Sequence, residues 1–144
     1  MASDNVILAR RWFEEVWNQR RSETIDELLT DESVSFSESG EVRGKQEFKD
    51  KTHNVFLSAF PDLHIDVDGT VADGDEVVVR WSGTATHLGD GLGFPPTGRK
   101  VSFRGMSWIR FGNGKMMEGY DCWDQSRMIE SLRAPATEQA GHGA

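Results

Sequence analysis

Residues 101–123 read VSFRGMSWIRFGNGKMMEGYDCW, and this stretch decides the fold. Apolar residues of one parity, such as Val101 and Phe103, precede a Gly112-Asn113-Gly114 turn, and Met117 and Trp123 continue that parity after it. Alternation with period two indicates strands with one buried face, and an Asn-Gly pair between two such runs is typical of a hairpin. The stretch therefore predicts two long antiparallel strands.

More strands precede this hairpin. Residues 63–71 alternate apolar and polar side chains, residues 77–85 form a longer run, and Asp73-Gly74-Asp75 joins them as a turn. Two short strands, residues 34–36 and 41–43, are expected around a turn at 37–40.

Amphipathic patterns predict three helices ahead of the long strands. The first covers roughly residues 4–19, with Ser3 as its cap and apolar side chains at helical spacing. A short second helix covers residues 22–29. The third follows Gly44 and is ended by Pro61. Helices followed by antiparallel strands indicate an α+β fold, in which one long bent sheet wraps around the helices.

We expect one domain over residues 1–133 and a disordered tail over 134–144, where Ala, Gly, Pro and polar residues show no periodicity. A chain of 144 residues is long enough for one real core. Its net charge of −8 and the lack of a basic run argue against binding nucleic acid or an anionic membrane surface. We expect a cytoplasmic protein, because no signal peptide or apolar span is seen. One cysteine excludes an internal disulfide, and the scattered histidines give no metal-ligand spacing, so we expect no metal.

Asp121 is the clearest candidate for chemistry. On the strand 116–123 it shares a face with Met117, Gly119 and Trp123. If that face is the inner one, burial raises the pKa of the carboxyl, which can then take and return a proton near neutral pH. The alternative is that the face meets solvent or a partner and that Asp121 is hydrated.

Other polar residues have simpler interpretations. Asp124 precedes a short helix expected over Gln125–Leu132 and is its predicted cap. His87 either braces the adjacent loop or holds a substrate oxygen. Ser107 lacks a nucleophile-elbow motif, so we expect it at most to hydrogen-bond a ligand. The glycine-rich loop 89–98 is no phosphate cradle, because a strand follows it, and we expect it to border the pocket mouth and to move.

Two tryptophans are predicted to lie on different faces of their strands. Trp81 lies with Val77 and Val79 and belongs to the core or to a pocket wall. Trp108 and Met106 lie on the opposite face of their strand, which predicts that this face is covered as well, most economically by a second copy of the chain.

Several segments resemble the SnoaL-like polyketide cyclases. Gly93–Lys100 (GFPPTGRK) resembles a Gly-x-Pro-Pro-Thr-x-Arg segment of that family, and Arg110–Glu118 (RFGNGKMME) with the following Tyr120–Asp124 (YDCWD) resembles another. Phe60–Leu63 and Gly83–His87 are also similar to family segments. The resemblance covers about residues 5–133, and the order and spacing of the segments make it more specific than any one of them.

The resemblance implies a cone-like α+β barrel of the nuclear-transport-factor-two type, with three helices on a strongly curved antiparallel sheet and one apolar pocket. It also implies a homodimer or larger assembly, no cofactor, and an acid/base role for Asp121. The cyclases carry Gln and His where this chain has Gly105 and Ser107, and Asn where the nearest match is Ser35, so we expect more room and fewer hydrogen bonds. The predicted substrate-binding residues are Ser35, Phe56, Trp81, Phe103, Gly105, Ser107, Met117 and Trp123.

The sequence is compatible with three functions. The first is a cofactor-independent cyclase that closes a ring of an aromatic, anthracycline-like polyketide by aldol condensation, with Asp121 as acid/base. The second is a hydroxylase of the same family, which would use molecular oxygen and a separate reductase. The third is a non-catalytic binding or dimeric assembly module. Asp121→Asn is expected to abolish either enzyme activity and to leave a binding module intact.

Overall fold

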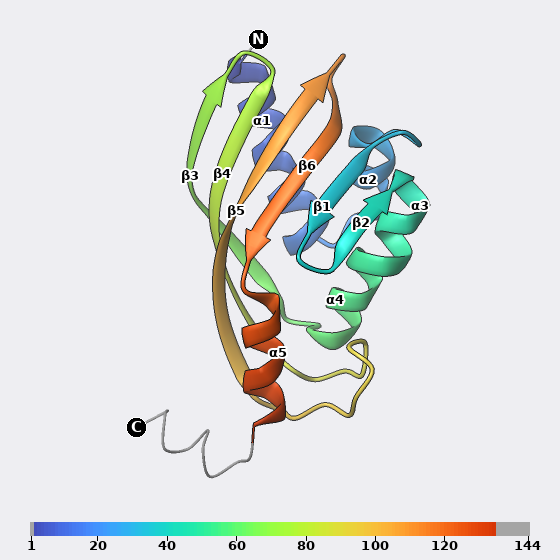
Figure 1. The fold of residues 1–144 in the computed structure, drawn as a ribbon, viewed down its shortest axis with the longest axis vertical. Helices are drawn as coiled ribbons and strands as arrows, with labels where there is room; N and C mark the ends of the chain where they lie inside the picture. The colour runs from blue at the N-terminus through green and yellow to red at the C-terminus, as the bar shows by residue number, and fades with distance from the viewer. Residues whose placement is uncertain (1, 135–144) are drawn as a thin grey trace.

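The hairpin predicted from residues 101–123 forms the centre of the sheet in the computed structural model, which describes residues 2–134 (Figure 1). β5 (Lys100–Gly112) pairs antiparallel with β6 (Lys115–Trp123). Asn113 and Gly114 join them with φ of 52° and 75°. Two successive positive φ angles match the twist of the paired strands, which is why an Asn-Gly pair stands here.

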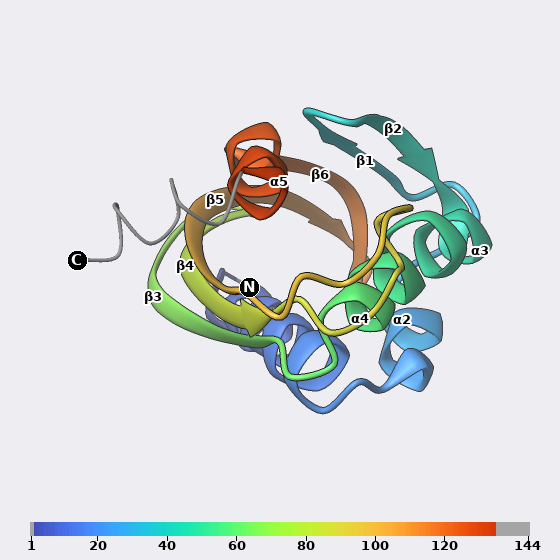
Figure 2. The ribbon, with the colours of Figure 1, turned by 90° about the horizontal axis from the view of Figure 1, so that it is seen from below.

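Six strands form one sheet in the order β2-β1-β6-β5-β4-β3. The four others are β1 (Val34–Ser37), β2 (Gly40–Arg43), β3 (His64–Asp73) and β4 (Glu76–Thr86). The sheet curves strongly but does not close, because β2 and β3 remain edges (Figure 2). Not every pairing is antiparallel as predicted: β1 runs parallel to β6, since the chain enters β1 from a helix and not from a hairpin with β6.

Three helical stretches precede the long strands, as predicted. α1 (Ala2–Arg11) continues into the π-helical segment η1 (Trp12–Asn18), and α2 (Ser22–Leu28) follows. The third stretch is continuous through α3 (Gly44–Phe48), η2 (Lys49–His53) and α4 (Asn54–Ala59). None of the helices in the described part of the chain is long and apolar enough to cross a membrane.

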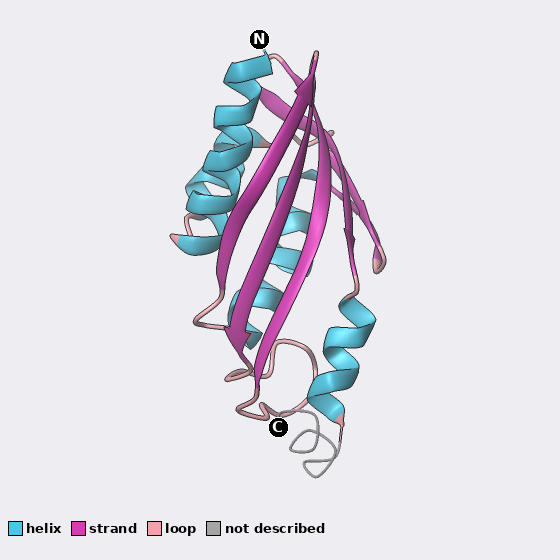
Figure 3. Ribbon diagram, turned by 90° about the vertical axis from the view of Figure 1, so that its left-hand side faces the viewer, coloured by secondary structure: helices cyan, strands magenta, loops and turns pink. Residues whose placement is uncertain are grey.

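Helix ends test the predicted caps. α5 (Gln125–Arg133) closes the described chain, and the Asp124 carboxylate accepts a hydrogen bond from the Arg127 N–H at 3.0 Å, as an N-cap does. Figure 3 shows this helix set apart from the others, beyond the end of β6. Ser3 was expected to cap the first helix, but that helix begins at Ala2 and includes Ser3. Residues 135–144 of the predicted tail lie outside the described residues.

The core lies between the concave face of the sheet and the first helix. Val77 and Val79 of β4 are fully buried, as are Ala9 and Val16 opposite them in the helix. Burial of such side chains is the main stabilising contribution of the fold, at roughly 1.5–3 kcal/mol for each larger apolar residue. The predicted α+β class and the curved, cone-like sheet are therefore confirmed, with an open sheet in place of a closed barrel.

Candidate functional site

The helices and the concave face of the sheet enclose a largely apolar cavity of about 140 Å³. Every strand of the sheet and the first and third helical stretches contribute to its wall. A concave, mainly apolar space with a few polar groups is the usual form of a small-molecule site.

The cavity gathers most of the residues that the sequence predicted for a site. Asp121 lines it from β6, and Ser107 lines it from the paired position on β5. The other predicted residues that line it are Ser35, Phe56, Trp81, Phe103 and Trp123.

Gly105 does not line the cavity, and the extra room predicted there does not exist. A Cβ at this position would lie 2.6 Å from Cβ of Trp123 and 2.9 Å from Cζ2 of Trp81. Trp123, the Cys122 carbonyl oxygen and the Trp81 indole therefore occupy the space that a missing side chain leaves. Gly105 serves this close packing and offers no surface to a substrate.

Met117 does not line the cavity either, and Met116 takes its place. Arg110 pairs with Glu118 but Phe111 pairs with Met116, so Met117 is the extra residue of a β-bulge. The bulge shifts the parity of the strand, and a prediction from strict alternation then selects the wrong methionine. Met116 is 8% exposed and belongs to the core cluster.

A chain of hydrogen bonds holds Asp121. The Trp81 indole N–H donates to Ser107 Oγ at 3.1 Å, and the Ser107 hydroxyl donates to Asp121 Oδ1 at 2.5 Å. Because an indole N–H can only donate, Ser107 must accept from Trp81 and turn its own proton toward the carboxylate. Ser107 was predicted at most to hydrogen-bond a ligand, and in the structure its partner is Asp121.

The second carboxyl oxygen of Asp121 faces the cavity. Within residues 2–134, Oδ2 makes no hydrogen bond, and it is not among the buried polar atoms that lack a partner. An oxygen with neither a bond nor full burial keeps accessible surface, and Asp121 lines the cavity. Oδ2 is therefore free to meet a ligand, while Oδ1 is fixed from behind.

Two opposing effects set the protonation of Asp121. Burial raises the pKa of the carboxyl, and the hydrogen bond from Ser107 lowers it by a smaller amount. The net result is a pKa above the ordinary value, which suits a group that must both accept and return a proton.

Sequence reasoning missed part of the cavity wall. The helical residues were expected only as a buried face, and Gly119 was noted only as sharing the face of Asp121. The available signal was the high number of aromatic residues, 5 Trp and 8 Phe in 144 residues, which either fill a core or line a pocket. The missed lining residues include Trp12, Phe13, Trp17, Phe48, Thr52, Met116, Glu118 and Gly119.

His87 is a bracing residue and does not reach the cavity. It is fully buried, its Nδ1 accepts from the Thr97 N–H at 3.1 Å, and its ring packs against Phe60 and Phe94. Burial lowers the pKa of this histidine, which favours the neutral ring. Of its two interpretations, the structure agrees with bracing the 89–98 loop. Motion of that loop stays a prediction.

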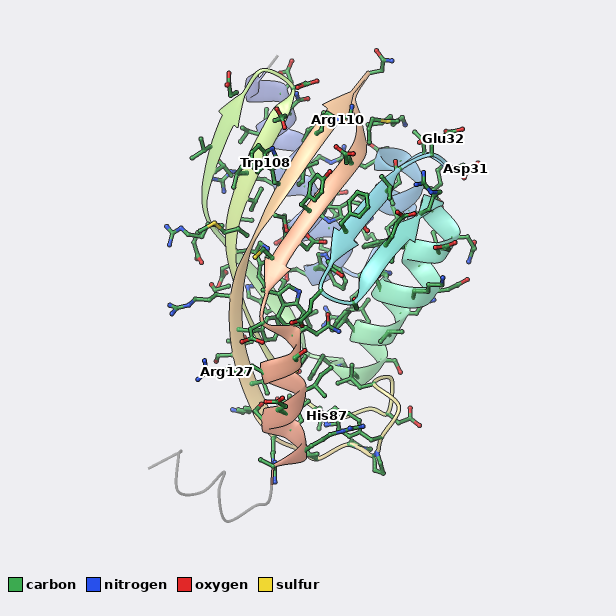
Figure 4. The ribbon with its side chains drawn as sticks, viewed as in Figure 1. Asp31, Glu32, His87, Trp108, Arg110 and Arg127 are labelled. Carbon is green, nitrogen blue, oxygen red and sulfur yellow. The ribbon has the colours of Figure 1, made fainter. Side chains whose placement is uncertain are left out.

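The outer face of the sheet carries exposed apolar side chains. Met106, Trp108 and Tyr120 are 52%, 53% and 48% exposed, and Phe36 stacks on Tyr120 at 5.0 Å between ring centroids. Figure 4 shows Trp108 and Arg110 on this face. The exposure is that of an unpartnered face, and the second copy predicted to cover it stays a prediction.

Comparisons with known proteins agree with this fold. A model of the SnoaL-like polyketide cyclase family matches residues 7–132. A candidate SnoaL-like polyketide cyclase from Jannaschia sp. CCS1 has a TM-score of 0.85 at 26% identity, with 93% of this chain and 94% of that chain covered. AclR, a candidate hydroxylase from Streptomyces galilaeus, has a TM-score of 0.80 at 29% identity, with 94% and 89% covered.

A third solved structure extends this group. A candidate polyketide cyclase from Acidithiobacillus ferrooxidans has a TM-score of 0.76 at 26% identity, with 92% of this chain and 96% of that chain covered. A search of curated proteins found no match.

Proposed function

The chain belongs to the SnoaL-like polyketide cyclase family, and we propose that it is a cofactor-independent acid/base enzyme acting on an aromatic polyketide precursor, with Asp121 as the proton-transfer group. The family and the solved relatives support a polyketide-related function in general. One observation carries the specific proposal: the Asp121 carboxyl, partly shielded in a largely apolar cavity, has one oxygen fixed by Ser107 and the other facing open space.

The proposed step is an intramolecular aldol condensation. Asp121 Oδ2 removes a proton from a carbon next to a carbonyl, and the electron pair of the broken C–H bond forms an enolate. The enolate carbon attacks a second carbonyl of the same molecule, which makes the new ring bond. The protonated Asp121 then returns its proton to the alkoxide oxygen, so the carboxylate is restored and the product has the mass of the substrate.

The cavity supports this step in two physical ways. The apolar wall holds a flexible precursor in a folded conformation with its reacting carbons close together. Less entropy is then lost in reaching the transition state. The hydrogen bonds from Trp81 through Ser107 fix the plane of the carboxyl before substrate arrives, so little reorganisation is needed during reaction.

A second candidate function is hydroxylation, which the 29% identity with AclR favours. In that reaction Asp121 would deprotonate a phenol or hydroquinone, and the electron-rich ring would react with molecular oxygen. One oxygen atom enters the ring, the other leaves as water, and a separate reductase supplies two electrons. The same carboxyl serves both reactions, so the product distinguishes them.

Product masses test the proposal. The protein is incubated in air with a panel of polyketide precursors, with and without NADPH and a quinone. A product of unchanged mass, or one that has lost only water or methanol, formed without reductant supports cyclisation. A gain of one oxygen that requires air and reductant supports hydroxylation.

Two variants assign the chemistry to Asp121. Asp121→Asn is expected to lose turnover, while Asp124→Asn makes the same chemical change three residues away and keeps the helix cap, because Asn caps as well as Asp. Full turnover by Asp121→Asn would contradict both enzyme functions. Ligand binding without turnover by the wild type would favour a binding module.

A further inference from the structure

Gly119 differs from the other described glycines. It lies in the middle of β6, its φ is outside the left-handed region, and a Cβ built on it would meet nothing within 4 Å. It pairs with Ile109, which is buried and lines the cavity, so Gly119 also faces inward. Neither backbone conformation nor close packing explains a glycine at this position.

Two other strand glycines on the sheet have packing explanations. A Cβ at Gly105 would meet Trp123 and Trp81 as described above, and a Cβ at Gly83 would lie 2.6 Å from Cε2 of Phe103. Neighbouring side chains, and at Gly105 also backbone, fill the space at both positions. The space over Gly119 is not filled by the protein.

A glycine inside a strand weakens it, because the unfolded chain gains freedom and no side chain packs. A Cβ fits at this position without contact, and β-branched residues favour strands, so a β-branched residue is expected to stabilise β6 here. Since the fold gains nothing from Gly119, the open space is best explained by the approach of a ligand.

Polar groups stand on two sides of this space. Asp121 is two residues further along β6 on the same face, and Ser35 pairs with Gly119 from the parallel strand β1. Standard strand spacings put the Cα atoms of Ser35 and Asp121 roughly 8 Å apart. The Ser35 hydroxyl makes no hydrogen bond with the described residues, so it can serve a ligand.

The size of the cavity limits what can enter. An apolar cavity of about 150 Å³ is large enough to hold benzene, and this cavity measures about 140 Å³. Its enclosed volume accommodates one six-membered ring, and because the cavity is partly open, further fused rings can extend out of it.

We infer that the space over Gly119 seats a single oxygenated ring whose two oxygens, in a 1,3 relation, hydrogen-bond Asp121 and Ser35. A phenol or enol O–H donates to Asp121 Oδ2, and the other oxygen accepts from the Ser35 hydroxyl. This inference rests on the proposed function, because it names the part of the substrate that the same site takes. A larger precursor presents its terminal ring here.

Calorimetric titration with resorcinol and with phenol tests this ring-binding space over Gly119, called the seat from here on. The wild type is expected to bind resorcinol about two- to tenfold more tightly than phenol, the range of one net hydrogen bond. Ser35→Ala is expected to remove that preference. Gly119→Val is expected to weaken resorcinol binding at least tenfold, and Gly119→Ala less, because the added atoms occupy the ring's space. Ser102→Val adds the same side chain at an exposed position of β5 outside the cavity and is expected to change nothing.

The melting temperature distinguishes binding lost because a side chain fills the seat from binding lost because the protein unfolds. Gly119→Val is expected to melt no lower than the wild type, so lost binding cannot come from unfolding. Unchanged resorcinol affinity in Gly119→Val, a lower melting temperature for that variant, or no resorcinol binding by the wild type would each overturn the inference. If Gly119→Val loses binding while Asp121→Asn keeps turnover, the seat stands and the proposed function fails; the reverse pattern rejects the seat alone.

Discussion

Replacing Ser107 by alanine is expected to move the pH dependence of turnover to higher pH. Ser107 supplies the hydrogen bond that favours ionised Asp121 and partly opposes the effect of burial. Without it, burial acts unopposed and the pKa of Asp121 rises further above its ordinary value. The base form of the enzyme is then scarce until a higher pH is reached.

The size of this effect follows from the bond that is lost. A hydrogen bond to a charged group contributes about 1.5–3 kcal/mol, and about 1.4 kcal/mol corresponds to a factor of ten. On the acidic limb of the profile, kcat/KM of Ser107→Ala is expected to fall roughly ten- to a hundredfold. The Trp81 N–H also loses its acceptor, which costs about 1–3 kcal/mol of unfolding free energy if it stays buried.

The assay is kcat/KM of the wild type and Ser107→Ala, measured from acid to alkaline pH. Trp81→Phe is the comparison variant, because it removes the N–H that orients the hydroxyl and leaves the donor to Asp121 in place. It is expected to shift the profile less. A uniform loss at every pH with an unmoved acidic limb would refute the reasoning and would leave Ser107 a packing role only.

Three further changes test the packing, the burial of charge and the outer face. Asp121→Asn is expected to stabilise the protein at neutral pH, because the folded pKa of Asp121 is raised and its ionised form destabilises the fold above that pKa but not below the unfolded pKa. An equal difference in melting temperature between variant and wild type at acid and at neutral pH would contradict this. Gly105→Ala is expected to lower the unfolding free energy in urea by about 1–3 kcal/mol, because its Cβ would meet Trp123, and an unchanged midpoint would contradict that contact. Trp108→Glu is expected to convert a dimer to a monomer in light scattering, and a monomeric wild type would reject the predicted interface.

The fold was predictable because its signals are local. The Asn113-Gly114 pair needs no partner to indicate a hairpin, and Asp124 caps the helix that begins at the next residue through the Arg127 N–H. The pairing of β1 with β6 was not predictable in direction. Short strands separated by more than seventy residues carry no signal of whether they run parallel.

The site was predictable in its carboxylate and less so in its wall. The parity of β6 identified Asp121, but the bulge at Met117 is invisible to strict alternation and misplaced one methionine. Glycine has no side chain to reveal its surroundings in sequence. Gly105 and Gly119 look alike there, yet the space over Gly105 is filled by Trp123, Trp81 and backbone, and the space over Gly119 opens onto the cavity.

The central claim is that Asp121 transfers the proton in this cavity, and turnover by Asp121→Asn tests it most directly. With a precursor that the wild type converts, kcat/KM of this variant is expected to fall about 10²–10⁴-fold, while the fold is retained. Asp124→Asn should keep wild-type turnover. Turnover by Asp121→Asn within a few-fold of the wild type would contradict the account.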